Sequence, residues 1–570
     1  MTQSISLLWQ SICAQPRAEF LVNPKERRTY RDLAKRIQTN CAAFDAAGLS
    51  AGDRLTIALS DEFEASAVFL AALLDGLVPA LLSPHAFEER RASIYRSLDA
   101  ALEIDDTKPL SMPETNGLLE RWWSNNSNGR APRLPDLPDD HLAYVLFTSG
   151  TTATPRGVMV THQNLFSQLA TLKRLFSLST GSRIFNGTPL SHTDGLVQGP
   201  LLTAAAGATL LRPGPFEVAT LEPYLDFLRS EAATHMIANP TLLAIITRMA
   251  PETDYFDQSC FQAIVSTGGA LSLDLWEAVE MAFGVRVWNV YGMTESVADA
   301  LYAGDHPEMG ARGTIGLPID CDARIAGGGE NGELELSGAN ISPGYWRNEA
   351  RTRETQSADG WFRTGDIVRR TADGSFEYLG RIKTAINQGA VTIHPEEIDE
   401  ALLAHPTVLE VATVGLPSAD FEEIAVAAVV ANEPIDPSAL HAHCARRLEP
   451  LKRPKDIVLF GSIPKTASGK TDRTSLASLL MQQTAISEPV SATEGTAATV
   501  IATAADVFGV FPGALTLESS TETVPGWDSF NHLKLIMAVE RQTGVSLSTK
   551  DIISIRDLAG LSEKLEASSL

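Results

Sequence analysis

The sequence is poor in positive charge, and it lacks both paired cysteines and long hydrophobic runs. Its 570 residues carry 46 lysine and arginine side chains against 70 aspartate and glutamate side chains. This balance argues against a protein that binds nucleic acid or an anionic membrane, because both partners require a basic face. It does not exclude a nucleotide substrate, since a cleft that binds one anion needs only a few cations.

Targeting and membrane patterns are also missing from the sequence. The N-terminus has no cationic stretch ahead of an apolar one, as a secretory signal would. The longest apolar run, residues 65–74, is about half as long as a membrane span requires. We therefore expect a cytoplasmic protein without a membrane span.

The cysteines are few, odd in number and widely spaced, without a CxxC pair. They are Cys13, Cys41, Cys260, Cys321 and Cys444. This spacing is typical of small core residues in a reducing compartment and not of disulfides or metal ligands.

Hydrophobic patterning divides the chain into regions, and its length predicts three or four domains. Residues 55–82 have a strand–helix–strand order, which predicts a βαβ unit and a mostly parallel sheet. After Arg324, short strands alternate with Gly-rich turns and predict a small β-rich subdomain. Residues 384–480 form a smaller α/β unit, and residues 482–499 have the Ala, Ser, Thr, Glu and Pro composition of a flexible linker. Residues 500–570 have helical periodicity.

A loop rich in Ser, Thr and Gly follows an apolar strand in residues 147–162, FTSGTTATPRGVMVTH. Small residues let backbone N–H groups approach phosphate oxygens, hydroxyls add donors, and an arginine supplies positive charge. Six residues separate Gly150 from Gly157, so the loop is not a Walker A motif. The candidate phosphate-binding residues are Thr148, Ser149, Gly150, Thr151, Thr152 and Arg156.

Five further motifs follow this loop in order. They are YGMTE (291–295), GTIGLP (313–318), WFRTGD (361–366), GRIKT (380–384) and PKTASGKTDR (464–473). With the loop, they resemble the adenylate-forming superfamily of acyl- and aryl-CoA ligases, peptide-synthetase adenylation domains and luciferases. The resemblance covers roughly residues 10–480. It implies an α/β fold, with a large N-terminal adenylation core at 1–382 that has parallel sheets, and a small mobile α/β subdomain at 383–481.

The resemblance also implies a reaction. A substrate carboxylate attacks the α-phosphate of ATP, and because two anions repel, the site must supply cations and orient both partners. By resemblance, residues 148–152 bind the β- and γ-phosphates, Thr294 contacts the α-phosphate, and Glu295 holds Mg²⁺, which prefers oxygen ligands.

Further roles follow from the same resemblance. Asp366 accepts the ribose hydroxyls, Arg381 reinforces that contact, and Tyr291 belongs to the same ATP site. Lys470 matches the mobile catalytic lysine that bridges the carboxylate and the α-phosphate. Lys383 occupies the hinge position, about which the small domain rotates between two half-reactions.

Two motifs depart from the family pattern. The phosphate loop has Ala153 where glycine is usual and Arg156 where lysine is usual, so we expect a stiffer loop that is still cationic. In NQGAVTIHPEEID, Gly389 stands one place early and Ala390 takes the usual glycine position. That loop lines the thiol tunnel in the family, so this departure concerns thioester formation.

Four short segments are candidates for the acid pocket. His192 resembles the histidine found here in acyl- and aryl-activating members, although it could instead be a packed core histidine. Amino-acid-activating members usually place an aspartate within a Phe-Asp motif, and Asp194 keeps an amine-bearing substrate as an alternative. The candidate pocket residues are His192, Thr193, Asp194, Asn239, Gly268, Gly269 and Asn289.

Residues 526–540, GWDSFNHLKLIMAVE, resemble an acyl or peptidyl carrier domain. There a serine carries 4′-phosphopantetheine, and Ser529 would set the phosphodiester against the positive end of a helix. The alternative is that Asp528 or Ser529 is an N-cap. The resemblance implies a four-helix carrier bundle at 500–570, a linker at 482–499, and a phosphopantetheinyl transferase as a partner.

One function is favoured over three alternatives. We expect ATP-dependent activation of a small or medium carboxylic acid as acyl-AMP, then transfer to the phosphopantetheine thiol of the chain's own carrier, which the linker keeps at around millimolar effective concentration. The alternatives are an acyl-CoA ligase whose carrier serves another enzyme, an amino-acid-activating adenylation–thiolation didomain, and a non-catalytic docking platform. From Ser491 onward there are ten acidic and five basic residues, which fits docking on a basic patch of a downstream biosynthetic enzyme.

Overall fold

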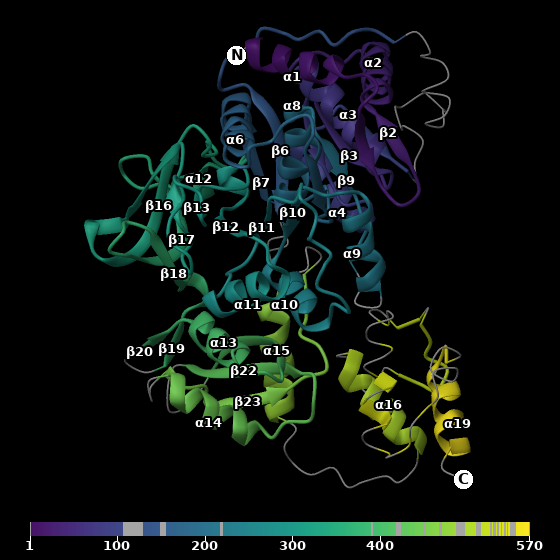
Figure 1. The fold of residues 1–570 in the computed structure, drawn as a ribbon, viewed down its shortest axis with the longest axis vertical. Coiled ribbons are helices and arrows are strands. Elements are labelled where there is room, and N and C mark those ends of the chain that lie inside the picture. Colours follow the sequence, from purple (N-terminus) through teal and green to yellow (C-terminus); the bar gives the residue numbers. More distant parts are fainter. Residues whose placement is uncertain are drawn as a thin grey trace. The chain divides into compact units, whose positions relative to one another are not determined.

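The computed structural model divides the chain into two compact units (Figure 1). The first contains residues 1–216 and 222–378, and the second contains residues 217–221 and 379–570. The division therefore falls at 378 where the sequence predicts 382, and residues 500–570 belong to the second unit. The structure describes residues 2–106, 129–148, 156–216, 220–388, 391–417, 423–448, 452–466, 470–485, 496–508, 515–521, 523–524, 527, 532, 535–536, 538–540, 543, 545, 547 and 555–568.

A nine-stranded sheet runs through the first unit in the order β14-β13-β12-β11-β10-β8-β9-β1-β2. Neighbours from β12 to β1 pair in parallel, and antiparallel strands extend both edges. Every residue of β10 and β11 is buried, as expected of parallel strands covered on both faces. The strands are β1 (Glu19–Val22), β2 (Arg27–Thr29), β8 (Arg183–Asn186), β9 (Thr209–Leu211), β10 (His235–Ala238), β11 (Ala263–Ser266), β12 (Val287–Tyr291), β13 (Leu301–Ala303) and β14 (Leu317–Pro318).

A second, parallel sheet has the order β4-β3-β5 and confirms the predicted βαβ unit. Its strands are β3 (Arg54–Ala58), β4 (Val78–Leu81) and β5 (Leu102–Asp105), with α3 (Glu62–Leu74) between the first two. Nearly all of α3 is buried, because apolar residues surround this helix on every side. The remaining helices of this unit are α1 (Thr2–Ala14), α2 (Tyr30–Ala46), α4 (Glu88–Leu98), α6 (His162–Leu175), α7 (Thr193–Leu196), the π-helical η1 (Val197–Leu201), α8 (Leu202–Ala206), α9 (Leu221–Ser230), α10 (Pro240–Met249), α11 (Leu273–Phe283) and α12 (Glu349–Glu354).

The first unit also contains a hairpin and a small antiparallel sheet. Strands β6 (Leu142–Thr148) and β7 (Arg156–Thr161) pair on either side of the phosphate loop. The small sheet confirms the predicted β-rich subdomain, although it begins slightly before Arg324. Its strands are β15 (Cys321–Ile325), β16 (Asn331–Gly338), β17 (Phe362–Arg370) and β18 (Phe376–Arg381), and the last three residues of β18 belong to the second unit.

The second unit contains a three-stranded sheet, β21-β22-β23, in which β22 pairs antiparallel with β21 and parallel with β23. Three helices pack against it. The elements are β19 (Ile386–Gln388), β20 (Val391–Ile393), α13 (Pro395–Leu403), β21 (Val408–Pro417), β22 (Glu423–Ala431), α14 (Pro437–Arg447), β23 (Asp456–Leu459) and α15 (Arg473–Ala485).

The C-terminal segment has a hydrophobic core of its own. Helices α16 (Thr496–Phe508) and α19 (Leu558–Ser568) contribute to it, together with Trp527 and Ile536. The predicted linker, 482–499, is too long, because α15 extends into its start and α16 into its end.

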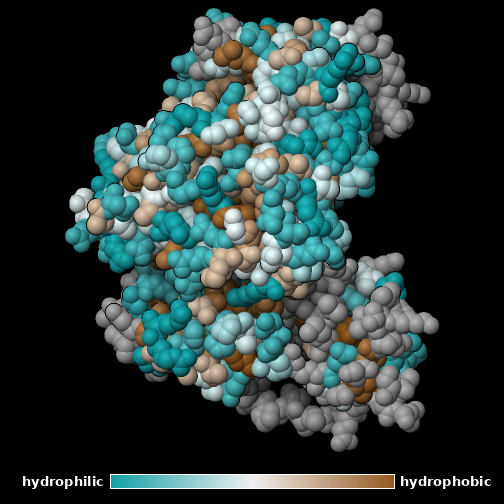
Figure 2. Space-filling view, in the orientation of Figure 1, coloured by the Kyte–Doolittle hydropathy of each residue, from teal (hydrophilic) through white to brown (hydrophobic). Residues whose placement is uncertain are grey.

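Surface and burial test two further expectations. Cys41 and Cys444 are buried as predicted, whereas the expectation of a core position is wrong for Cys13, which is exposed, and Cys260 and Cys321 are partly exposed. Among the described helices, none has the length and hydropathy that a membrane span needs. The face in Figure 2 is mostly hydrophilic, with hydrophobic residues in small patches.

Candidate active site

A tight turn follows β12 and carries the YGMTE residues. Gly292 has no room for a side chain, since a Cβ there would lie 1.7 Å from the carbonyl oxygen of Ala298. The 3-10 turn η3 (Thr294–Ser296) comes next, and then Val297 and Ala298 adopt left-handed φ angles of 54° and 90°. A β-branched residue there is strained, so the surrounding packing must fix this turn. The turn therefore holds its acidic residue in a defined place.

The side chain of Glu295 is positioned by a tyrosine. The Tyr345 hydroxyl donates a 2.5 Å hydrogen bond to Glu295 Oε1, and the Ser342 N–H donates to the Glu295 carbonyl oxygen at 2.7 Å. Burial, and then the adjacent Glu295 carboxylate, raise the pKa of Tyr345. The phenol thus stays protonated as a donor, and its hydrogen bond to Oε1 orients the Glu295 carboxylate.

Asp366 lies on β17 and is fully buried. The Tyr291 hydroxyl, at the end of β12, donates to Asp366 Oδ2 at 2.6 Å, while the Asp366 N–H donates to Thr364 Oγ1 at 3.0 Å. This hydrogen bond joins the YGMTE and WFRTGD motifs, which are 75 residues apart in sequence.

Several predicted pocket residues also meet. His192 caps α7: its Nδ1 accepts from the Asp194 N–H at 3.4 Å and lies 3.3 Å from Asp194 Oδ2. A Cβ placed on Gly268 would lie 3.6 Å from that carboxylate, and one on Gly269 would lie 3.4 Å from Pro240. Segments after β8, β10 and β11 therefore converge, as the carboxyl ends of neighbouring parallel strands do.

The other pocket candidates differ in whether their side-chain oxygens have a hydrogen-bond partner. Asn239 caps α10 by accepting from the Leu242 N–H at 2.8 Å, so its side chain has a structural partner. Asn289 is buried, and its side-chain Nδ2 donates to the Thr314 carbonyl oxygen at 2.9 Å, whereas its side-chain Oδ1 has no hydrogen-bond partner. The Thr193 hydroxyl is likewise buried without a partner.

Two residues of the predicted phosphate loop lie at strand ends. Thr148 ends β6 and pairs in register with Arg156, which begins β7. The predicted residues Ser149, Gly150, Thr151, Thr152 and Ser529, and the departures Ala153, Gly389 and Ala390, lie outside the described residues.

Three predicted residues belong to the second unit. Arg381 ends β18, Lys383 lies in the 3-10 turn η5 (Ile382–Thr384), and Lys470 follows in the PKTASGKTDR motif. All three are exposed. The Thr466 N–H donates to the Lys470 carbonyl oxygen at 2.7 Å, and this backbone hydrogen bond fixes the main chain at Lys470.

Two buried residues of this region were not predicted from the sequence. One is Tyr345, and the other is Asp299, which is wholly buried four residues after Glu295 and accepts from Gln198 Nε2 at 3.0 Å. Burial, and then the charge of Asp194, raise the pKa of Asp299 well above its usual range. No motif marked either residue, because their partners come from distant segments.

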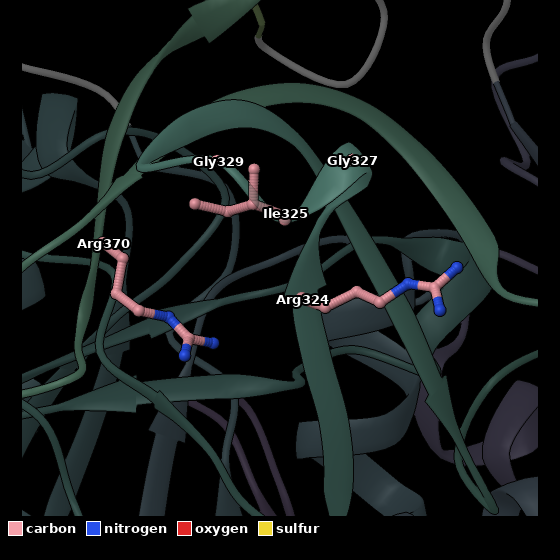
Figure 3. Close-up of a pocket in the computed structure, with 6 residues that line it drawn as sticks. Arg324, Ile325, Gly327, Gly329 and Arg370 are labelled. Atoms are coloured by element: carbon pink, nitrogen blue, oxygen red, sulfur yellow. The ribbon is translucent and has the colours of Figure 1, made fainter.

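A cavity of about 550 Å³ lies elsewhere in the first unit, at the glycine turn after β15 (Figure 3). Arg324 and Arg370 line it, together with Ile325 and Gly327. Arg324 points away from Arg370, pairs with Asp359 and stacks over a tryptophan ring. None of the predicted site residues lines this cavity, and its two cations do not converge.

Comparisons with known proteins agree with these motifs. Residues 8–346 match the family described as AMP-binding enzyme, and residues 397–470 match the AMP-binding enzyme C-terminal domain. A sulfoacetate–CoA ligase of Cupriavidus necator is 32% identical over 81% of this chain and 94% of that protein. A naringenin synthase of Pestalotiopsis fici is 27% identical over 93% of this chain, although only 21% of that protein is covered.

The fold has solved relatives as well. ATP-bound MatB from Rhodopseudomonas palustris superposes with a TM-score of 0.72 at 24% identity, over 83% of this chain and 98% of that one. The chain therefore belongs to the AMP-binding enzyme family. It is an adenylate-forming ligase, which uses ATP to activate a carboxylic acid as its acyl-AMP.

Proposed function

We propose that this ligase activates a small or medium carboxylic acid and transfers the acyl group to a phosphopantetheine thiol on its own Ser529. In the first step a carboxylate oxygen bonds to the α-phosphorus of ATP, and pyrophosphate leaves. In the second step the thiol sulfur bonds to the acyl carbon, AMP leaves, and the thiol proton goes to solvent. The observation that best supports the first step is the hydrogen bond between Tyr291 and Asp366, because it joins two motifs of the proposed nucleotide site.

The residues suit their proposed roles in adenylation. Asp366 would accept the ribose hydroxyls, with Arg381 beside them, and Thr294 would contact the α-phosphate. The backbone of residues 148–152 and the charge of Arg156 would receive the outer phosphates. Lys470 would neutralise charge between the carboxylate and the α-phosphate, and Lys383 would serve as the hinge.

The chemistry of Glu295 fits Mg²⁺. Magnesium binds through one or two carboxylates together with substrate phosphates, and no set of three His, Cys, Asp or Glu ligands occurs in the part of the chain that the structure describes. A single carboxylate held in place by Tyr345 meets that need. When bound, the ion would reduce the negative charge of the phosphates that faces the attacking carboxylate.

Two observations show that residues 500–570 are a folded segment shared with a relative, which a carrier at 500–570 requires. The described residues of this segment share a hydrophobic core around Trp527. The match to the naringenin synthase covers 93% of the chain, whereas residues 1–499 make up only about 88%, so that match extends into the segment. The carrier would need a phosphopantetheinyl transferase and a downstream enzyme that takes the acyl group.

An acyl-CoA ligase is the second candidate. It is favoured by the relative that aligns over 81% of the chain, whose name gives CoA as the thiol. In that case free CoA would accept the acyl group, and the segment at 500–570 would serve another enzyme. A non-catalytic platform is disfavoured by the presence of Glu295, Asp366 and Lys470.

ATP–pyrophosphate exchange across a panel of acids tests the first step. We expect exchange to depend on an added acid and to fall about 10²-fold or more in Lys470→Ala, while the matched change at the exposed Lys35 has no effect. Acid-independent exchange, or full activity in Lys470→Ala, would contradict the assignment.

Acyl loading tests the second step. After treatment with a phosphopantetheinyl transferase, the intact protein should gain the mass of the acyl group, and Ser529→Ala should not, although its exchange activity stays normal. Faster transfer to free CoA than to the holo protein would favour the CoA ligase instead.

A further inference from the structure

Lys470 stands on a short hairpin whose two arms are joined by their backbones. Lys465 on the first arm and Thr471 on the second form an antiparallel bridge. The Thr466 N–H on the first arm donates to the Lys470 carbonyl oxygen on the second at 2.7 Å. Because the arms are tied to each other, the place of Lys470 depends on what holds the base of the hairpin.

Arg473, three residues after Lys470, holds the second arm at its base. It begins α15, its Nη2 donates to Asp399 Oδ2 on α13 at 2.6 Å, and its Nε donates to the Thr413 carbonyl oxygen on β21 at 3.1 Å. Asp399 Oδ1 in turn accepts from the Thr413 N–H at 2.7 Å. The three residues therefore close a ring of hydrogen bonds that fastens the end of the hairpin to a helix and a strand.

A second contact holds the first arm, but it is more exposed. Lys465 pairs with Glu410 on β21, and their side chains are 33% and 25% exposed; pairs at such positions contribute little. The Asp399 side chain is only 13% exposed, so its charge-assisted hydrogen bond to Arg473 is stronger. Removing Arg473 would leave a buried carboxylate without this partner, which is costly. We therefore expect Arg473 to hold the hairpin more firmly than Lys465 does.

We propose that Arg473 is a positioning residue for adenylation, because it fastens to α13 and β21 the hairpin that brings Lys470 to the reacting groups. This inference rests on the proposed role of Lys470. A lysine that neutralises charge in the transition state must lie at the right distance, and a misplacement of about 1 Å lowers a rate by about 10²-fold. The second step has no proposed role for Lys470, so loss of the ring should slow the first step and spare the second.

The two steps can be measured separately on the full-length protein with Arg473→Met, which keeps an unbranched stem and removes the donors. With the acid that best supports ATP–pyrophosphate exchange, we expect kcat to fall by about 10²-fold while KM for ATP stays nearly the same, as when a transition-state interaction is lost. Release of AMP from chemically prepared acyl-AMP in the presence of a thiol, either CoA or the holo protein, should keep its rate. The matched change Arg453→Met removes hydrogen bonds to the C-terminal end of α14 and should alter neither step.

A double variant distinguishes positioning from a role in folding. If Arg473 acts only through Lys470, Arg473→Met combined with Lys470→Ala exchanges no more slowly than Lys470→Ala alone. A further fall in the double variant would overturn the inference. So would equal losses of both steps in Arg473→Met, because Arg473 would then only stabilise the second unit, and so would unchanged exchange.

Arg473→Lys is a second variant should Arg473→Met not fold. Its ammonium keeps the charge beside Asp399 but lacks the planar fork that meets both acceptors, so the first step should again be slowed selectively, by a smaller factor. The proposed function is tested apart from this. Full exchange in Lys470→Ala would overturn the role of Lys470 and this inference together, whereas loss in Lys470→Ala without loss in the Arg473 variants would overturn this inference alone.

Discussion

His235 shows how burial sets the charge of a single residue. It begins β10 and is 1% exposed, its ring lies near those of Phe176 and Trp288, and its Nδ1 shares a 2.8 Å hydrogen bond with Thr234. Burial lowers its pKa to about 4. Since an unfolded histidine titrates near 6.5, the unfolded chain takes up this proton first as the pH falls.

The unfolding free energy of the first unit should therefore fall with decreasing pH, in part because of His235. Its contribution is present above pH 6.5 and is lost as the pH falls toward 4, by about 3 kcal/mol in total. Denaturant unfolding between pH 7 and 4 measures this slope. We expect His235→Phe, which keeps an aromatic ring, to make the slope shallower. This change should not remove the slope, because burial also lowers the pKa of His162, whereas a change at the exposed His85 leaves the slope as it was. An unchanged slope in His235→Phe would show that another group is responsible.

At the scale of the element, the turn from Gly292 to Ala298 determines where Glu295 lies. A methyl group on Gly292 would overlap the Ala298 carbonyl oxygen, so Gly292→Ala must displace the turn. Gly284, the C-cap of α11, also has a left-handed φ of 64°, but nothing lies within 4 Å of an added Cβ.

These two glycines form a matched pair for mutation. Gly284→Ala should cost about 1 kcal/mol of unfolding free energy from backbone strain alone and keep full exchange activity. Gly292→Ala should lower kcat by about 10²-fold, because a misplacement of about 1 Å at reacting groups has that effect. Circular dichroism and pyrophosphate exchange on both variants check this. Equal activity in the two would mean that the turn does not position the reaction.

The same elements show how far the sequence carries. The βαβ order of residues 55–82 followed from local patterns. The family resemblance assigned YGMTE and WFRTGD to one nucleotide site, and the hydrogen bond that joins them is seen only in the structure. The end of the linker did not follow from local patterns: residues 496–499 lack bulky apolar side chains, yet their alanines have high helix propensity and begin α16. Tyr345 and Asp299 could not be predicted either, since burial and pairing depend on segments that meet only in three dimensions.

At the scale of the whole molecule, separate hydrophobic cores predict separate unfolding transitions. Trp527 is buried in the core of the C-terminal segment, with its ring 4.9 Å from that of Phe508. Trp276 is fully buried on α11 in the first unit, where its Nε1 donates to Glu280. Replacing either by alanine removes a large buried ring.

Each change should therefore act on one transition in calorimetry. Trp527→Ala should destabilise its core by about 3–5 kcal/mol and leave pyrophosphate exchange unchanged, although it prevents acyl loading. Trp276→Ala should lower a different transition together with exchange. A single transition that shifts in both variants would show that the cores unfold as one.

The hydrogen bond from Tyr345 also bears on which metal suits the enzyme. Because Glu295 Oε1 already shares electron density with the Tyr345 hydroxyl, Oε2 is the stronger metal ligand, and the hydrogen bond favours monodentate over bidentate binding. Magnesium, which is small and octahedral, takes carboxylates in that way and fills its other positions with phosphate and water. Calcium has a larger shell, often completed by a bidentate carboxylate. A phenol outside the metal's own coordination sphere would thus bias the denticity of the site, and with it the preference between two divalent cations.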